Sequence, residues 1–180
     1  MTTTRPSRLQ AYRDRRNAFF RTNEHTPLTQ AQCANFVPLD YFPENTDLAF
    51  IVDVDTDIPK DPVELPTTTG DTRPYVPHGK ITFEVEGVEA TLTVYREPDR
   101  GRLIVPFRDT TNDDETYGAG RTVDPQERPD GRLSIDFNYA YGPYCQYNDN
   151  WVCTVPPMEN WLKVPIRAGE RLYPNKESAY

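Results

Sequence analysis

Alternation of apolar and polar residues is clearest in the middle of the chain. From Lys80 to Glu86 and from Val88 to Arg96, apolar residues occupy every second position, as in strands with one buried face. Glu86-Gly87 between these runs is a typical tight turn, so the pattern predicts an antiparallel hairpin. We expect the apolar members of these runs, and of the runs that follow, to be buried: Ile81, Phe83, Leu92, Val94, Ile104, Val105 and Ile135.

Other short apolar runs extend this pattern in both directions. Their expected strands are Leu48–Val54, Val63–Thr68, Leu103–Phe107, Arg121–Asp124 and Arg132–Phe137. The turns at Pro98–Gly101 and Pro129–Gly131 are short, so the later strands should continue the hairpin as an antiparallel meander. The sequence therefore predicts a mainly β fold, a single-domain antiparallel β barrel or sandwich, with its β-rich body over residues 48–170.

Helical spacing occurs only near the N-terminus. Ser7-Arg8-Leu9-Gln10 matches a capping box, and apolar residues then recur at helical intervals, which predicts an N-terminal α-helix over residues 7–21. We expect its basic face to lie on the protein's own body. Thr29 to Gln32 repeats the box and predicts a short second helix around residues 31–36.

The pattern contains no linker or repeat that would divide the chain. Residues 1–180 are therefore expected to form a single domain. The polar tail at residues 174–180 is expected to be loose.

Composition and charge narrow the classes of partner. The chain has 180 residues and a net charge of -8, which disfavours binding to nucleic acid or to an anionic membrane. Only four of its 20 basic residues are lysines. Excess acid with scarce lysine is typical of proteins adapted to high salt, and a GC-rich genome would give the same bias; the sequence leaves both open.

No segment of the sequence looks like a membrane span or a signal peptide. The longest apolar run is Leu48–Val52, much shorter than the roughly 20 residues of a spanning helix. The N-terminus lacks the apolar core of a signal peptide. We therefore expect a soluble, cytoplasmic protein, and the sequence does not predict its oligomeric state.

Candidate binding residues gather after the Leu103–Phe107 run. Arg108 and Thr110 follow an expected buried strand end, a suitable place for an anion clamp. Arg121 follows two glycines, which allow a ligand close to the backbone. We expect Arg108 and Arg121 to converge on one accessible pocket. The alternative, in which Asp109, Glu115 or Asp136 pairs with each arginine to brace the loops, stays open.

Further polar and aromatic residues complete the expected site. Four tyrosines surround Cys145, and rings with polar tips can either line a pocket or pack a loop onto the body. The expected ligand-binding residues are Arg108, Thr110, Glu115, Arg121, Asn138, Tyr141, Tyr144 and Asn160. If the site carries acid/base chemistry, its groups are Asp136 and Glu159.

Cys145 and Cys153 stand eight positions apart, and a loop of that length can bring them together. A zinc site would need two more ligands, and no other Cys or His has a supporting spacing, so no metal is expected. The favoured interpretation is a pair of buried thiols or a facultative disulfide, and the redox state is not decided by the sequence.

Several long segments of this region resemble a known family. They are PFRDTTNDDETYGAGR, DFNYAYGPYC and WVCTVPPMENWLKVPIRAGE, and they look like the signature segments of domain of unknown function family 1684. The resemblance covers nearly the whole chain and implies no activity, substrate or cofactor. The chain departs from the family pattern at Gly142, where asparagine is usual, and at Trp161, where arginine or a similar residue is usual.

Three hypotheses on function follow. The leading one is a protein that binds an anionic small molecule in a pocket at the barrel loops, with acid/base hydrolysis as an extension. The second is a small barrel that holds the phosphate of a flavin or another cofactor through Arg108, Thr110 and Thr111. The third is a non-catalytic scaffold or interaction protein. The sequence decides neither whether the protein is an enzyme nor which cofactor it uses.

Overall fold

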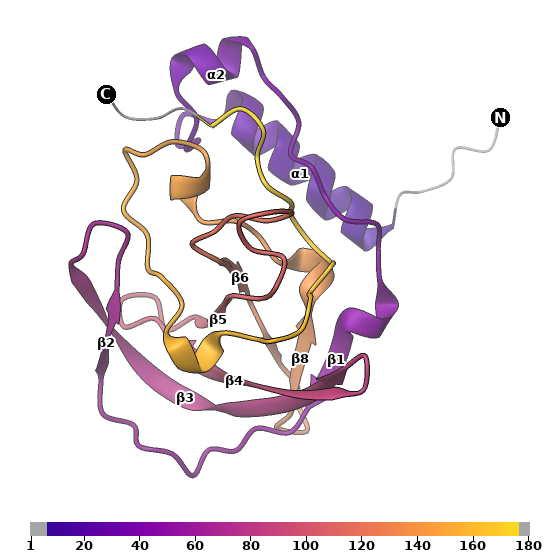
Figure 1. The fold of residues 1–180 in the computed structure, drawn as a ribbon, viewed down its shortest axis with the longest axis vertical. Helices are drawn as coiled ribbons and strands as arrows, with labels where there is room; N and C mark the ends of the chain where they lie inside the picture. Colours follow the sequence, from indigo (N-terminus) through magenta and orange to yellow (C-terminus); the bar gives the residue numbers. More distant parts are fainter. Residues whose placement is uncertain (1–6, 177–180) are drawn as a thin grey trace, which may run out of the picture.

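Two antiparallel sheets form the body of the protein, and a helical N-terminal segment lies at the end opposite β3 in Figure 1. This arrangement is seen in a computed structural model that describes residues 7–176. After its last short helix, the chain returns to the helical end as an irregular segment, drawn in yellow in Figure 1.

The larger sheet has five strands in the order β2-β3-β4-β5-β6, so neighbours along the chain are also neighbours in the sheet. Their bounds are β2 Val63–Pro66, β3 Thr72–Val85, β4 Val88–Arg96, β5 Leu103–Phe107 and β6 Arg121–Val123. The predicted antiparallel meander is therefore confirmed from the central hairpin to β6.

The central hairpin has the register that its alternation predicts. Val85 pairs with Val88, and Ile81 pairs with Leu92. Both turn residues, Glu86 and Gly87, have positive φ angles, as a type I′ turn requires. All the residues predicted to be buried are buried: Ile81, Phe83, Leu92, Val94, Ile104, Val105 and Ile135.

Strand β3 begins earlier than its sequence pattern predicts. Its first half contains two prolines, and these hide the strand pattern in the sequence. Pro74 lies in the part of β3 that pairs only with β2, and Pro77 lies in the part that pairs only with β4. Since proline lacks an N–H group, it is tolerated where a strand has one partner rather than two. The register shifts between Pro77 and Gly79, which marks an irregularity where the two pairings meet.

The smaller sheet has the order β1-β8-β7. Its strands are β1 Ala49–Val52, β7 Gln126–Glu127 and β8 Leu133–Asp136. The expectation that β8 continues the meander is wrong, because β8 pairs with β7 on one edge and with the distant β1 on the other. Within the described part of the chain the sheets do not close into a barrel, and the mainly β fold is sandwich-like.

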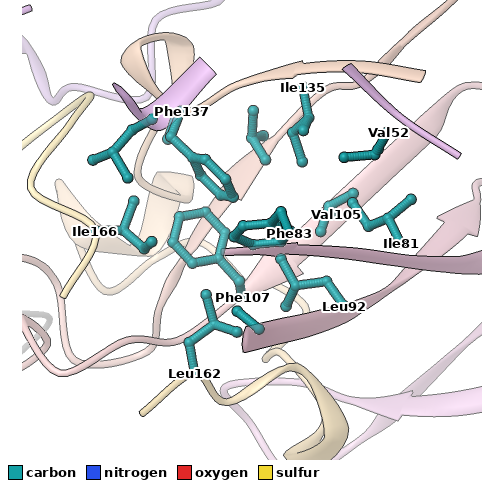
Figure 2. Close-up of a cluster of buried hydrophobic side chains, with 14 of the residues drawn as sticks. Val52, Ile81, Phe83, Leu92, Val105, Phe107, Ile135, Phe137, Leu162 and Ile166 are labelled. Atoms are coloured by element: carbon teal, nitrogen blue, oxygen red, sulfur yellow. The ribbon is translucent and has the colours of Figure 1, made fainter. Parts of the chain in front are cut away.

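One hydrophobic core joins the two sheets. Figure 2 shows Phe83 from β3, Phe107 from β5 and Phe137 after β8 with their rings together. The ring centroids of Phe107 and Phe137 are 5.2 Å apart in an edge-to-face contact. The irregular C-terminal segment also enters this core with alternate residues, namely Leu162, Val164, Ile166 and Ala168.

The two predicted helices are confirmed. Helix α1 (Arg8–Thr22) begins where the Ser7 hydroxyl accepts the backbone N–H of Gln10 at 3.0 Å, and its buried Leu9 and Phe20 pack on the body. Helix α2 (Gln30–Ala34) begins with a complete Thr29–Gln32 capping box. The described residues also form four short 3-10 helices: η1 Thr46–Leu48, η2 Phe137–Tyr139, η3 Tyr144–Gln146 and η4 Met158–Asn160.

The start of the C-terminal tail, up to residue 176, contacts the body. Gln32 donates to the backbone carbonyl of Asn175 at 2.6 Å, and Lys176 pairs with Asp149 at 2.6 Å. Residues 177–180 of the predicted tail lie outside the described residues. Nowhere between residues 7 and 176 does a helix have the length and apolar character needed to cross a bilayer.

Candidate functional site

Arg121, the first residue of β6, lies in the interior, where only 1% of its side chain is exposed. Its guanidinium donates to Asp109 Oδ2 at 2.7 Å. It also donates to the backbone carbonyls of Ile166 and Ala168 at 2.7 and 2.6 Å. Burial lowers the pKa of Arg121, and the charge of Asp109 opposes this shift. Arg121 therefore fastens the C-terminal segment to the sheet and presents no donor to a ligand.

Arg108 points away from this buried pair, because successive residues of an extended chain face opposite sides and Asp109 faces inward. Its guanidinium carbon lies 4.6 Å from the ring centroid of Trp161, and it pairs with Asp113 at 3.1 Å. The prediction that Arg108 and Arg121 converge on one accessible pocket is therefore wrong. For Arg121 the bracing alternative applies, with Asp109 as its partner.

Two predicted ligand-binding residues, Asn138 and Asn160, are buried and hold backbone segments together. Asn138 donates to the carbonyl of Asn45 at 2.7 Å and accepts the backbone N–H of Asn45 at 2.8 Å. Asn160 bonds both backbone groups of Thr93 and the carbonyl of Pro106. Because their amides are consumed in this way, neither is available to a ligand.

The remaining predicted residues are dispersed. Thr110 is exposed, and Glu115 pairs with Arg167 at 2.8 Å. Asp136 accepts the backbone N–H of Asn138 at 2.9 Å and so caps η2. Glu159 accepts the hydroxyl of Tyr95 at 2.6 Å. The two predicted acid/base groups, Asp136 and Glu159, do not border the same cleft.

Tyr141 and Tyr144, both predicted to bind a ligand, line the same cleft of about 370 Å³ on the larger sheet. We call it the aromatic cleft. Its floor includes Tyr75, Ile104 and Pro106, and the loop from residue 143 to residue 154 forms a wall. Val105 points into the main core and Ile104 belongs to a separate buried cluster with Tyr75, so β5 is covered on both faces. The full lining is Arg73, Tyr75, Glu97, Arg102, Ile104, Pro106, Thr122, Tyr141, Pro143, Tyr144, Trp151, Val152, Cys153 and Thr154.

The wall of the aromatic cleft is held by contacts at both of its ends. Trp151 lies edge-to-face with Tyr144, with 5.1 Å between ring centroids, and its indole N–H donates to the carbonyl of Pro27 at 3.0 Å. Farther along, the backbone N–H of Thr68 donates to the carbonyl of Cys153 at 2.9 Å. These contacts attach the loop to the N-terminal segment and to the turn between β2 and β3.

Arg102 is the centre of a charged cluster at the edge of the cleft. It pairs with Glu97 at 3.1 Å and with Asp124 at 3.0 Å. Tyr141 donates its hydroxyl to Asp124 at 2.9 Å. Burial raises the pKa of Asp124, against the lowering effect of Arg102 and the Tyr141 hydrogen bond. Burial also raises the pKa of Tyr141, so its phenol stays neutral.

Arg73 and Arg100 differ from Arg102, because among the described residues neither forms a salt bridge. Arg73 donates to the carbonyl of Val152 at 3.1 Å, and its side chain is otherwise exposed. Arg100 borders an adjoining hollow of about 440 Å³ that shares Arg73, Tyr75 and Glu97 with the aromatic cleft. Arg73 in the lining of the cleft and Arg100 in the adjoining hollow are thus two cationic groups that no described carboxylate neutralises.

Tyr141 also borders a second cleft, of about 480 Å³, between α1 and the smaller sheet. Its lining includes Tyr12, Asp124, Asp136 and Tyr139, with Arg8 as its cation. Two carboxylates make this cleft less suited to an anion than the aromatic cleft. Neither cleft carries a metal centre, since residues 7–176 hold no group of three or more His, Cys, Asp and Glu placed to bind one.

Sequence reasoning missed Arg73, Tyr75, Arg100 and Trp151 as candidates. Arg100 stands in a turn that the sequence did predict, but the direction in which a turn presents its arginine depends on what packs beside it. Arg73 precedes Pro74, in a part of β3 whose prolines hide the strand pattern. A possible indication was the excess of arginine in an acidic chain, which does not single out these two positions.

Comparison with known proteins gives a family but no activity. The family described as protein of unknown function (DUF1684) matches residues 34–171, which include every strand and the whole lining of the aromatic cleft. The chain is also similar to the solution NMR structure of the uncharacterized protein from gene locus rrnAC0354 of Haloarcula marismortui. That similarity has a TM-score of 0.68 and 32% sequence identity over 91% of each chain. No curated protein matches the chain.

Proposed function

Since the chain belongs to the family described as protein of unknown function (DUF1684), as its segments indicated, we propose a function from the geometry of the aromatic cleft. We propose that this cleft binds an anionic small molecule with a flat, apolar body. The proposed ligand class is the one expected from the sequence. The proposed location is different: it is the cleft beside Arg73, and not a pocket between Arg108 and Arg121.

The observation that carries the proposal is the pair of unneutralised arginines. Apart from arginines on α1, Arg73 and Arg100 are the only described arginines without a salt bridge; Arg73 lines the aromatic cleft, and Arg100 borders the hollow that adjoins it. In a chain of net charge -8, carboxylate partners are abundant. Guanidinium groups left without one can donate to a carboxylate, sulfonate or phosphate.

The apolar lining supports the second half of the proposal. Tyr75, Tyr141, Tyr144 and Trp151 supply rings, and Ile104 and Pro106 supply an apolar floor. A volume of about 370 Å³ lies within the usual range for small-molecule sites, roughly 300–1,000 Å³. Trp151 is 39% exposed, which leaves part of its indole for a ligand ring to cover.

Two measurements test the proposal. Native mass spectrometry of freshly purified protein would detect a retained ligand. Titration with 8-anilinonaphthalene-1-sulfonate, an anionic aromatic probe, would then compare wild type with Arg73→Gln. We expect the variant to bind about ten- to a hundredfold more weakly, because a hydrogen bond to a charged group contributes roughly 1.5–3 kcal/mol.

Arg15→Gln is the matched control, because Arg15 is exposed on α1 and borders none of the clefts described here. It changes the net charge by the same amount as Arg73→Gln and should leave probe affinity unchanged. If both variants lost the same probe affinity, the loss would be an effect of net charge alone, and the proposed site would be contradicted.

A phosphate-bearing flavin belongs to the same ligand class, so flavin mononucleotide is a second probe. Quenching of its fluorescence on binding would favour the cofactor hypothesis over a free metabolite. The proposal is of binding and not of hydrolysis, because neither Asp136 nor Glu159 lines the aromatic cleft. A scaffold role is the conclusion if neither probe binds and no ligand is retained.

A further inference from the structure

Cys153 and Cys145 form a thiol pair at the wall of the aromatic cleft. Cys153 lines the cleft and is partly exposed, whereas Cys145 is buried beneath it in η3. The backbone N–H of Cys145 donates to Cys153 Sγ at 3.3 Å. The backbone N–H of Cys153 in turn donates to Thr68 Oγ1 at 3.2 Å, so both residues are fixed in place.

The surroundings make the two sulfurs unequal. A hydrogen bond from the Cys145 thiol lowers the pKa of Cys153 below its usual value, against the effect of burial, and backbone N–H groups and the charge of Arg73 act in the same direction as the hydrogen bond. The same hydrogen bond, together with burial, raises the pKa of Cys145. Of the two sulfurs, Cys153 therefore ionises more readily, and it is also the one that lines the cleft.

Tyr117 and Lys176 lie near Cys145 and lower its pKa, so they oppose this difference, which the hydrogen bond to Cys153 and burial maintain. Tyr117 hydrogen-bonds with Cys145, and the ammonium of Lys176 lies 5.3 Å from the centroid of the Tyr117 ring. Lys176 is itself paired with Asp149 at 2.6 Å. Cys33, the third cysteine, belongs to α2, and its thiol faces the carbonyl of Phe20 on α1 at 3.9 Å.

We propose that Cys153 is an oxidant-reactive thiol and that Cys145 is its resolving partner, so that a small peroxide entering the aromatic cleft converts the pair to a disulfide. The inference goes beyond the proposed ligand-binding function and does not depend on it. The site is a place of reversible covalent modification, with hydrogen peroxide or a small organic hydroperoxide as the oxidant.

The reaction has two steps. The Cys153 thiolate attacks one peroxide oxygen, the O–O bond breaks, and Cys153 becomes a sulfenic acid as hydroxide leaves and is protonated to water. Cys145 sulfur then attacks Cys153 sulfur, the S–S bond forms, and the sulfenic oxygen leaves as water with the Cys145 proton. Two thiols lose two electrons in total, the peroxide gains them, and a small thiol reverses the change by exchange.

The test uses the wild-type protein, so it does not depend on a variant that folds. The protein is reduced, desalted, treated with a stoichiometric amount of hydrogen peroxide, then denatured and labelled with N-ethylmaleimide. We expect labelling to fall from three cysteines to one, and peptide mapping to find Cys145 joined to Cys153 with Cys33 labelled. Oxidation of Cys33 first, or an unchanged Cys145–Cys153 pair, would overturn the proposal.

Two variants separate the roles of the sulfurs. In Cys145→Ser, peroxide should leave a sulfenic acid at Cys153 that dimedone traps. In Cys153→Ser, Cys145 should stay a thiol under the same exposure. A dimedone adduct at Cys145 in the second variant would reverse the assignment. The assay contains no anionic ligand, so its result is independent of whether the cleft binds one.

Discussion

At the scale of single residues, the buried polar side chains of this protein connect backbone segments that are distant in sequence. Asn160 joins β4 and β5 to η4, and Arg121 joins β6 to the C-terminal segment. The carboxylate of Glu170 accepts from Arg16 on α1 and from Gln146 on η3. Asn160, Arg121 and Glu170 each have several hydrogen-bond partners, which offsets the cost of placing polar groups in the interior.

Arg121→Met tests this role at its most buried charge. We expect a loss of about 3–5 kcal/mol in the free energy of unfolding, because Asp109 would keep a buried carboxylate without its ion-pair partner. Urea denaturation followed by circular dichroism measures it. The control Arg108→Met removes a more exposed salt bridge and should cost no more than about 1 kcal/mol. A small loss for Arg121→Met would contradict the bracing role.

At the scale of elements, the long strand β3 connects the two sheets. Its first part pairs with β2 and its second part with β4, and Lys80 forms an isolated bridge with Asp55, just after β1. Gly79 lies at this crossing, where the chain of Val54 and Asp55 approaches β3 closely. A residue without a side chain is needed there because the neighbouring backbone occupies the space.

Gly79→Ala should therefore destabilise the protein by about 1–3 kcal/mol, as expected when atoms are forced into a filled space. The added Cβ would lie 2.8 Å from the carbonyl oxygen of Asp55 and would also meet the Val54 side chain. Thermal denaturation compares it with Glu84→Ala, an exposed change on the same strand that should stay within about 0.5 kcal/mol. Equal stability of the two variants would show that β1 and β3 can separate without loss.

At the scale of the whole molecule, negative charge is in excess. The chain has 28 acidic and 20 basic residues, and many of its salt bridges are substantially exposed. Exposed pairs contribute little each, roughly 0–1 kcal/mol. Repulsion among the excess carboxylates is therefore expected to outweigh the attraction that salt would screen.

We expect the melting temperature near pH 7 to rise as KCl increases from about 0.05 M to about 1 M, because the Debye length shrinks from about 14 Å to about 3 Å. Differential scanning calorimetry measures this. The same titration near pH 5, close to the isoelectric point of about 4.8, should show a much smaller rise. A melting temperature that falls with salt at pH 7 would mean that the salt bridges dominate.

The sequence by itself determined the local elements of this protein. Alternation placed Ile81, Phe83, Leu92 and Val94 on the buried face of a hairpin, and a capping box placed the start of α1 at Ser7. These features follow from interactions between residues close in the chain, namely strand periodicity, turn geometry and a side chain bonding a nearby N–H. For the same reason, Glu86-Gly87 set the register of β3 against β4.

Only the tertiary structure decided which strands pair and which polar side chains remain accessible to a ligand. Alternation gave β8 a buried face but could not select β1 as its neighbour, since that pairing joins residues far apart in sequence. Arg121 and Arg73 are the same residue type, yet the returning C-terminal segment covers Arg121 and leaves Arg73 at a cleft. Whether an arginine braces a fold or faces a ligand depends on which distant carbonyls and carboxylates reach it, and only the folded chain brings those groups together.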